Sequence, residues 1–379
     1  MDALRVPPMP PGIEKVTSAL LATRRLCRYV EGTSKEDEAA LLEADLARMH
    51  GRRFAVACHS GGAALFLALK SLGVGAGDRV LVSSYTLSPV PGAVVHAGAS
   101  CVFVDTTRDL IVDTDHLRAL LSNAPPRTYK AFLLSYMRGH LPDLETVGTL
   151  CDEHGVALVE DAAHALGARV HGRRIGTEGT VSCFSFQAYK HVNAGEGGAL
   201  VTDEEDVAAR AILLSGSYGF YAKHLARPSD ATFRKWIPWT PNCSMRMSCL
   251  TAALVRAQLP LLEGRVVRWR DACRDMQAAL CASFGDKVSF PTPLEGTVPA
   301  PSSVQFYLAE PPCCDLVPGL KWVGDPEPKG FSACMELSDD AVRRFDEHAA
   351  TLFDLRVPYD LTPEEAEVVA ERVYSACHK

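Results

Sequence analysis

A lysine and an acidic pair stand beside short apolar runs in the middle of the chain. Val156-Ala-Leu-Val159 stops abruptly at Glu160-Asp161, and Val181-Ser-Cys-Phe-Ser-Phe186 leads on to Lys190. Short apolar runs bounded by turn residues are typical of strands in a covered sheet. An acid at one strand end and a lysine shortly after another suggest a cofactor that needs both. Pyridoxal phosphate is such a cofactor, because a lysine forms its Schiff base and a carboxylate pairs with its pyridinium nitrogen.

The elements that must position these groups follow a βαβ order. Phe54–Ala57 reads as a strand, Ser60–Gly62 as a tight turn, Ala63–Leu72 as a helix and Arg79–Val82 as the next strand. This order predicts an α/β fold with a parallel sheet covered by helices. The pattern continues through the apolar runs 100–104, 131–134 and 157–159, and 302–307 alternates like a half-buried strand. We also expect helices over 13–29, 35–49 and 247–275, and a last one from Pro363.

Length and composition indicate a globular protein of more than one domain. A chain of 379 residues is longer than one compact core usually serves. Its content of 47% hydrophobic and 22% charged residues is ordinary, and its net charge of −7 argues against a nucleic-acid binder. We find no apolar signal core and no run long enough to cross a bilayer. We therefore expect a cytoplasmic protein without membrane or nucleic-acid partners.

Cysteine usage points to reduced thiols. The thirteen cysteines are scattered, and although Cys313 and Cys314 are adjacent, no paired CxxC zinc spacing occurs. We therefore expect mostly buried free thiols and no metal site.

Several ordered motifs resemble those of the DegT/DnrJ/StrS aminotransferases. They are Glu160-Asp-Ala-Ala-His-Ala-Leu-Gly-Ala168, Cys183-Phe-Ser-Phe186, Lys190 and Gly195-Glu-Gly-Gly198. The resemblance extends from about Arg28 to about Gln258, with a fainter echo at Leu355-Arg-Val-Pro358. Members of this family are fold-type-I enzymes that use pyridoxal phosphate, and many of them aminate keto-sugars attached to nucleotides.

The resemblance implies a mainly parallel sheet of the seven-stranded type and a small α+β C-terminal domain. We accordingly divide the chain into three parts. Residues 1–30 form an N-terminal arm and helix, 31–255 the large cofactor-binding domain, and 256–379 a bridging helix with the small domain.

The family motifs imply a role for each residue at the reactive end of the cofactor. Lys190 is the covalent anchor and the general acid and base. Asp161 keeps the pyridine nitrogen protonated, and His164 lies near O3′ of the cofactor. Without the motifs, these residues would be a solvated chain end, a helix N-cap and a histidine satisfied on a helix flank.

The phosphate end is expected at a helix start. Ser60, Gly61 and Gly62 follow a strand and present backbone N–H groups to an anion, although the same residues suit a plain tight turn. The family normally reads Ser-Gly-Thr here, so Gly62 removes one hydroxyl. Ser185 resembles the family's phosphate-binding serine, whereas a serine in a strand is otherwise unremarkable.

Two further cofactor contacts depart from the family pattern. The ring is normally covered by an aromatic residue after a threonine, but the pair here is Thr86-Leu87, so either Leu87 or the preceding Tyr85 covers it. In relatives, the partner subunit of a dimer contributes an asparagine to the phosphate. The matching segment, Asn242 to Ser248, has Ser244 at that place and Asn242 two residues early. The resemblance thus implies a homodimer with shared sites.

Two arginines are candidates for substrate recognition. Arg138, in Ser135-Tyr-Met-Arg-Gly139, occupies an aromatic position of the family, and Arg356 replaces a small residue near the site mouth. Arginine recognises carboxylates and phosphates with two parallel hydrogen bonds. Either residue is a candidate to bind a substrate anion, and the alternative for Arg138 is a surface arginine on a loop.

The function that we expect is therefore a transamination in a biosynthetic pathway. An amino acid, glutamate or glutamine, gives its nitrogen to the cofactor, and a keto-sugar or another small carbonyl compound receives it. One alternative keeps the cofactor but performs lyase, decarboxylase or aldolase chemistry on a small carboxylate. The other is a regulatory relative that does not turn over.

Overall fold

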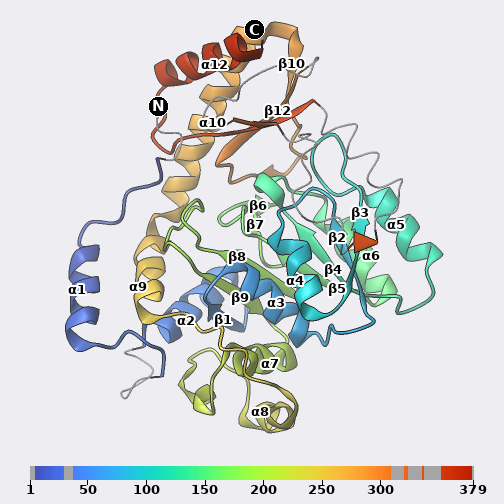
Figure 1. Ribbon diagram of the computed structural model, residues 1–379, viewed down its shortest axis with the longest axis vertical. Helices are drawn as coiled ribbons and strands as arrows, with labels where there is room; N and C mark the ends of the chain where they lie inside the picture. The colour runs from blue at the N-terminus through green and yellow to red at the C-terminus, as the bar shows by residue number, and fades with distance from the viewer. Residues whose placement is uncertain (1–4, 30–36, 309–319, 323–334, 337–350, 378–379) are drawn as a thin grey trace.

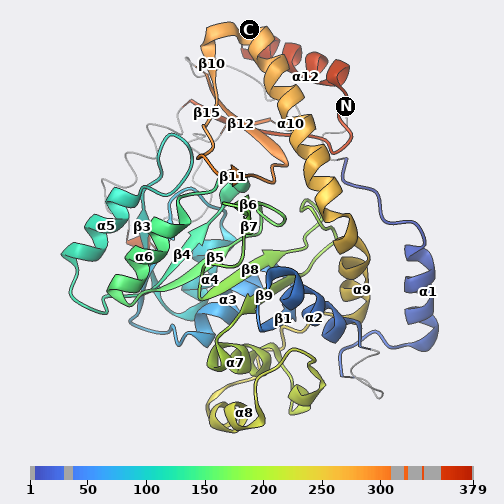
Figure 2. The ribbon, with the colours of Figure 1, turned by 180° about the vertical axis from the view of Figure 1, so that it is seen from behind.

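The computed structural model describes residues 5–29, 37–308, 320–322, 335–336 and 351–377 (Figure 1). A large domain is built around one sheet, and a smaller domain sits at the end of a long helix that rises from it (Figures 1 and 2). The reactive residues named above belong mostly to the large domain.

The central sheet has seven strands from the large domain and one short strand from late in the chain. In spatial order they are β1 (Phe54–Cys58), β9 (Gly198–Thr202), β8 (Val181–Ser185), β5 (Ala157–Asp161), β4 (Tyr129–Ser135), β2 (Arg79–Ser83), β3 (Ser100–Val104) and β14 (Met335–Glu336). Strand β9 pairs antiparallel with both neighbours, whereas β8, β5, β4, β2, β3 and β14 run parallel. The expected α/β fold with a mainly parallel sheet is confirmed.

Helices cover both faces of this sheet, which is why its strands are apolar throughout. In β4, Ala131 and Leu133 belong to one buried cluster, and Phe132 and Leu134 belong to the other. The first face carries α3 (Gly61–Ser71), α4 (Pro89–Ala97) and α7 (Glu205–Ser215). The opposite face carries α2 (Glu38–His50), α5 (Thr114–Asn123), α6 (Leu144–His154) and α9 (Cys249–Gln258).

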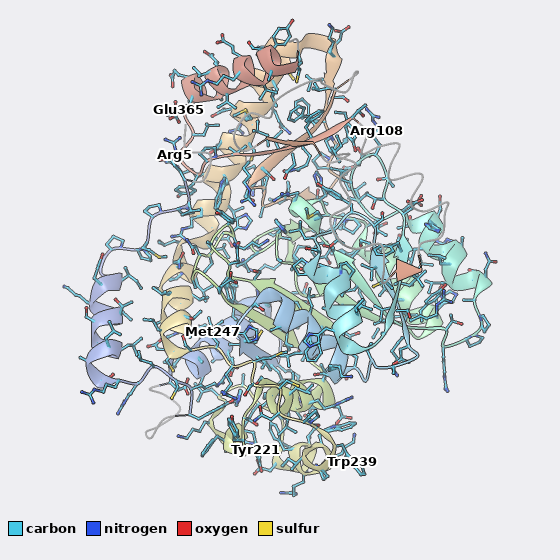
Figure 3. The ribbon with its side chains drawn as sticks, in the orientation of Figure 1. Arg5, Arg108, Tyr221, Trp239, Met247 and Glu365 are labelled. Carbon is cyan, nitrogen blue, oxygen red and sulfur yellow. The ribbon has the colours of Figure 1, made fainter. Side chains whose placement is uncertain are left out.

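The small domain packs two helices on a four-stranded antiparallel sheet. Helix α10 (Leu262–Phe284) leads into it, and α12 (Pro363–Cys377) ends it. The sheet order is β10 (Val288–Ser289), β12 (Ser303–Leu308), β15 (Leu352–Arg356) and β13 (Leu320–Trp322). The N-terminal arm joins this domain, because Arg5 forms an ion pair with Glu365 at 2.7 Å (Figure 3).

The remaining described elements lie around these two units. Helix α1 (Ile13–Thr23) stands at the side of the large domain beside α9, and α8 (Asp230–Trp236) packs below α7 (Figure 1). Strands β6 (Arg169–Val170), β7 (Arg173–Arg174) and β11 (Thr297–Val298) form a small sheet of their own.

Three helix boundaries differ from the sequence-based expectation. The helix expected over 247–275 is interrupted at Leu259–Leu261, because Pro260 has no N–H for a regular helical hydrogen bond. The helix expected over 13–29 ends at Thr23, where Arg24 takes a left-handed φ of 57°. The helix expected over 35–49 begins at Glu38, since Asp37 is its N-cap and accepts hydrogen bonds from two backbone N–H groups.

The described residues contain no helix long and apolar enough to cross a membrane. The ten cysteines in the described ranges form no disulfide with one another, and six of them are buried. Within the same ranges, no cluster of three or more His, Cys, Asp or Glu side chains could hold a metal ion.

Candidate active site

The site lies where three parallel strands end. In the strand register, Ser135 of β4 stands opposite Asp161 of β5, and Asp161 stands opposite Cys183 of β8. Ligands of open α/β sheets bind outside the carboxyl ends of such strands. A cavity of about 450 Å³ opens here, and its walls include both Asp161 and Lys190.

Asp161 is buried, with 5% of its surface exposed, and it is held from two sides. Ser135 donates a hydrogen bond to Oδ2 at 2.8 Å, and the backbone N–H of Ala163 donates to Oδ1 at 3.2 Å. Thr86 in turn donates to the hydroxyl of Ser135 at 2.9 Å. Burial raises the pKa of Asp161 above its usual value, against the hydrogen bond from Ser135 and the charge of Lys190.

Lys190 presents a reactive amine to the same cavity. Its Nζ lies 2.7 Å from Nε2 of His164. Burial lowers the pKa of Lys190 to about 7; Asp161 opposes this effect, and the charges of Arg138 and Arg356 add to it. Burial also lowers the pKa of His164 well below its usual value, so the imidazole is neutral at neutral pH. At neutral pH a substantial part of the amine is therefore unprotonated and able to act as a nucleophile and base.

The start of α3 closes the other end of the cavity. The first N–H groups of any helix have no intrahelical acceptor. Here Ser60 is the N-cap and accepts a hydrogen bond from the backbone N–H of Ala63, so the N–H groups of Gly61 and Gly62 remain for an anion. Gly61 lies so close to β8 that a Cβ there would be 2.8 Å from Cβ of Ser185. Gly198 is needed for a similar reason, since a Cβ there would lie 2.2 Å from the backbone oxygen of Ser60.

A buried carboxylate beside Asp161 fixes the neighbouring loop. Glu160 is fully buried and accepts hydrogen bonds from the hydroxyls of Tyr136 and Ser182, both at 2.7 Å. It also accepts hydrogen bonds from the backbone N–H groups of Gly176, Glu178 and Gly179. Five donors satisfy the charge, so the role of Glu160 is to hold β4, β5 and β8 in place.

The two candidates for covering the ring are in different places. Leu87 lines the cavity and is 40% exposed. Tyr85 is buried in a separate cluster with Met137, Tyr307 and two leucines, and it is not part of the cavity wall. On the side that Leu87 occupies, contact with a bound ring would be aliphatic.

Asn242 and Ser244 lie away from the cavity wall of this subunit. Both are exposed, and Oδ1 of Asn242 accepts a hydrogen bond from the backbone N–H of Ser244 at 2.9 Å. Ser244 has a left-handed φ of 55°. Within a single chain the two residues are therefore not brought together with Lys190.

The two arginine candidates differ in their partners. Arg138 is buried and forms an ion pair with Asp354 of β15. It lines a second cavity, of about 570 Å³, between α10 and the end of β4, and this cavity does not include Lys190. Arg356 lines the cavity of Lys190, and its guanidinium lies 4.4 Å from the ring centre of Tyr189.

Ser135 and Tyr189 are site residues that our sequence reasoning did not assign. The signal for Ser135 was the parallel register of β4 and β5, which puts the last residue of one strand beside the last residue of the other. Tyr189 precedes Lys190 directly, but nothing in the sequence reveals that a distant arginine lies over its ring.

These residues fit pyridoxal phosphate. The cavity combines a half-buried amine of lowered pKa, a buried carboxylate and a helix start against which only a glycine can pack. Lys190 would hold the aldehyde carbon, Asp161 the ring nitrogen, and the start of α3 with Ser185 the phosphate.

Comparison with known proteins identifies a family and several relatives of this chain. The family model of the DegT/DnrJ/EryC1/StrS aminotransferase family matches residues 24–303. The spore coat polysaccharide biosynthesis protein SpsC of Bacillus subtilis is 34% identical over 247 residues, which cover 65% of this chain and 62% of that protein. GDP-perosamine synthase of Caulobacter vibrioides is 34% identical over 226 residues, which cover 58% of this chain and 57% of that protein. The matched segments thus span about three fifths of these relatives.

The fold agreement extends over nearly the whole chain. The aminotransferase structure from Psychrobacter cryohalolentis superposes with a TM-score of 0.79 at 21% identity, covering 99% of this chain and 100% of that one. Because the family model alone covers well over half of the sequence, the chain belongs to the DegT/DnrJ/EryC1/StrS aminotransferase family.

Proposed function

We propose that this protein is a pyridoxal-phosphate-dependent aminotransferase. It takes the amino group of an amino acid, glutamate or glutamine, and delivers it to a keto-sugar or a related small carbonyl compound. The observation that carries the proposal is the pairing of an amine and a carboxylate, Lys190 and Asp161, in one cavity of about 450 Å³. Two relatives named for polysaccharide biosynthesis and for GDP-perosamine synthesis favour a sugar-derived acceptor.

The residues of this chain divide the work of proton transfer. Nζ of Lys190, with a pKa of about 7, would take a proton from the α-carbon of the donor and return one to the aldehyde-derived carbon of the cofactor, across the intervening nitrogen. The neutral ring of His164, 2.7 Å away, orients that amine. Asp161 holds a proton on the ring nitrogen, and bound pyridoxal phosphate supplies the electron sink.

We further propose that two copies of the chain form a homodimer with shared sites in the cytoplasm. Several large apolar side chains beside the segment 242–248 are exposed. Tyr218 is 67% exposed and Trp239 is 80% exposed. Trp239 is labelled in Figure 3. A second copy that covers them would bring Asn242 or Ser244 of one subunit toward the phosphate of the other. The free thiols among the described cysteines suit a reducing compartment.

The function is tested by absorption spectra of the purified protein with pyridoxal phosphate. A visible band should appear, and it should be absent in Lys190→Ala. It should persist in Lys70→Ala, because the amine of Lys70 donates to the backbone oxygens of Val74 and Ala97 instead. Added glutamate or glutamine should bleach the band and release the corresponding keto acid. Bleaching accompanied by carbon dioxide or by an elimination or cleavage product would indicate lyase, decarboxylase or aldolase chemistry. Absence of any band would indicate a protein without turnover.

The dimer is tested by mixing two inactive variants. Lys190→Ala and a double change of Asn242 and Ser244 to alanine damage different halves of a shared site. Mixed dimers should regain part of the activity, because one of their two sites is intact. If mixing restores nothing although sedimentation shows dimers, each site is built from a single chain.

A further inference from the structure

The cavity of Lys190 contains a guanidinium that is poised for an anion. Arg356 ends β15 of the small domain and is half-buried in the cavity wall. Within the described part of the chain, no side-chain carboxylate forms an ion pair with it. Its guanidinium lies over the ring of Tyr189, 4.4 Å from the ring centre. A stacked guanidinium keeps its N–H edge available for hydrogen bonds, because stacking occupies only its flat face.

Three carboxylates lie near this arginine. Glu196 is exposed in the same cavity wall and forms no ion pair with Arg356 in the described structure. The other two, Asp354 and Asp161, are held by other groups. Asp354, two residues earlier on β15, pairs with Arg138 through Oδ2 and accepts a hydrogen bond from Gln305 at 2.7 Å through Oδ1. Asp161 is held by Ser135 and by the backbone of Ala163. Because none of these three carboxylates is paired with Arg356 in the described structure, its charge is available to a ligand.

Arg138, in contrast, already has an anionic partner. It is 7% exposed, and binding a substrate would mean breaking its buried pair with Asp354. Leaving a buried carboxylate without its partner is strongly unfavourable. The second cavity, which Arg138 lines, is also separate from the wall that holds the reactive amine.

Arg356 is placed to bind an anion of the substrate, and it lies away from the residues that we assign to the cofactor phosphate. The phosphate end is built by the start of α3 and by Ser185, which belong to the large domain. Arg356 comes from the small domain and lies over Tyr189, the residue before Lys190. Burial is the main cause of the lowered pKa of Lys190, and the charges of Arg138 and Arg356 both add to it. An anion held here would be close to the carbon that reacts with the amine.

We infer that Arg356, stacked on Tyr189, is the receptor for a carboxylate of the amino-acid donor, and that Arg138 is not. This inference rests on the proposed function, since an amino donor always carries a carboxylate next to its reacting carbon. A planar carboxylate matches the two parallel N–H groups of an arginine better than the single point charge of a lysine. The donors accepted by this site are thus amino acids, and amines without a carboxylate are poor donors.

The test uses Arg356→Met and a matched control in the protein loaded with pyridoxal phosphate. Arg268→Met is the control, because Arg268 also lies over a tyrosine ring, at 5.2 Å from that of Tyr359, but it is exposed and outside the cavity. The probe is glutarate, a dicarboxylate without an amino group, whose dissociation constant is measured by calorimetry. Arg356→Met should weaken glutarate binding roughly 10- to 100-fold, and Arg268→Met should leave it unchanged. Arg356→Lys should recover only part of the loss.

Glutamate provides the second readout. In single-turnover bleaching, Arg356→Met should raise the glutamate concentration for half-maximal rate far more than it lowers the limiting rate. Wild-type affinity for glutarate in Arg356→Met, or the absence of glutarate binding to the wild type, would overturn the inference. Loss of pyridoxal phosphate from Arg356→Met would overturn it too, because the arginine would then serve the cofactor. Failure of the proposed function is seen separately, as a wild-type protein that binds glutarate but is not bleached by any amino acid.

Discussion

The hydroxyl of Ser135 donates a hydrogen bond to Oδ2 of Asp161 at 2.8 Å, and the same hydroxyl accepts one from Thr86. Two hydrogen bonds in series, from Thr86 to Ser135 and from Ser135 to Asp161, therefore end at the carboxylate that we assign to the ring nitrogen. This hydrogen bond lowers the pKa of Asp161, whereas burial raises it. Ser135 thus favours the charged form of the acid, which a pyridinium needs.

Replacing Ser135 with alanine should raise the pKa of Asp161 further and weaken the hold on pyridoxal phosphate. A hydrogen bond to a charged group contributes about 1.5–3 kcal/mol, so we expect roughly a tenfold or larger rise in the dissociation constant of the cofactor. The measurement is a fluorescence titration of the cofactor-free protein. Ser84→Ala is the control, since the hydroxyl of Ser84 bonds that of Thr106 instead. Equal affinity in both variants would show that Ser135 does not support the acid.

The lowered pKa of Lys190 predicts how stability depends on pH when no cofactor is bound. Folding moves this pKa from its ordinary value of about 10.4 down to about 7. Between these values the unfolded chain holds a proton that the folded chain lacks, so the contribution of Lys190 to the free energy of unfolding rises with pH. Below the folded pKa the full cost of burying the charged amine remains.

Urea unfolding of the wild type and of Lys190→Met at pH 7 and pH 9 tests this dependence. The difference in free energy of unfolding between the two proteins should shift in favour of the wild type at pH 9. The variant serves as the internal control, because all other titrating groups are shared. An identical change with pH in both proteins would show that the amine titrates in the folded chain as it does in the unfolded one.

Glu160→Gln should destabilise the whole protein. The carboxylate accepts five hydrogen bonds, and the amide group of glutamine would turn N–H groups toward some of those donors. We expect a loss of about 3 kcal/mol in free energy of unfolding. Glu263→Gln is the control, because Glu263 is more than half exposed and its ion pairs with Arg169 and Arg174 are superficial. Calorimetric melting of the two variants should separate them clearly.

Adjacent glycines at the start of α3 should respond differently to alanine. A Cβ at Gly61 would lie 2.8 Å from Cβ of Ser185, so Gly61→Ala should push the helix away from β8 and weaken cofactor binding roughly tenfold or more. A Cβ at Gly62 meets Pro89 at 3.8 Å, which is ordinary contact, so Gly62→Ala should bind the cofactor as the wild type does. Equilibrium dialysis against pyridoxal phosphate measures both. Equal losses would place the phosphate elsewhere.

The fold could be predicted from the sequence because the strands that the large domain contributes to the central sheet are short apolar runs bounded by turn residues. Each expected apolar run of the large domain lies on a strand of the central sheet, and Lys190 and Asp161 share a cavity because parallel strands end at one edge. The helix end at Thr23 was missed for a tertiary reason. Beyond it the chain leads to Arg28, whose guanidinium is buried against Glu43 and His224, and no local residue signals that turn.

The partners of the two arginines could not be read from the sequence either. Arg138 belongs to the large domain and Asp354 to the small domain. Their ion pair therefore depends on the position of the small domain at the end of α10. Arg356 and Tyr189 are equally distant along the chain. Local patterns identify groups that could bind an anion, but only the packing of the domains shows which of them already has a partner.

The order of the strands in the small domain has a consequence for synthesis of the protein. Strand β15, which ends at Arg356, lies between β12 and β13, although it is the last of the four to be made. The segments with Ser60, Asp161 and Lys190 are therefore synthesised well before β15. That strand completes the small sheet and, through Arg356, the cavity wall. A nascent chain that stops short of β15 would carry the amine and the acid in a pocket open on one side.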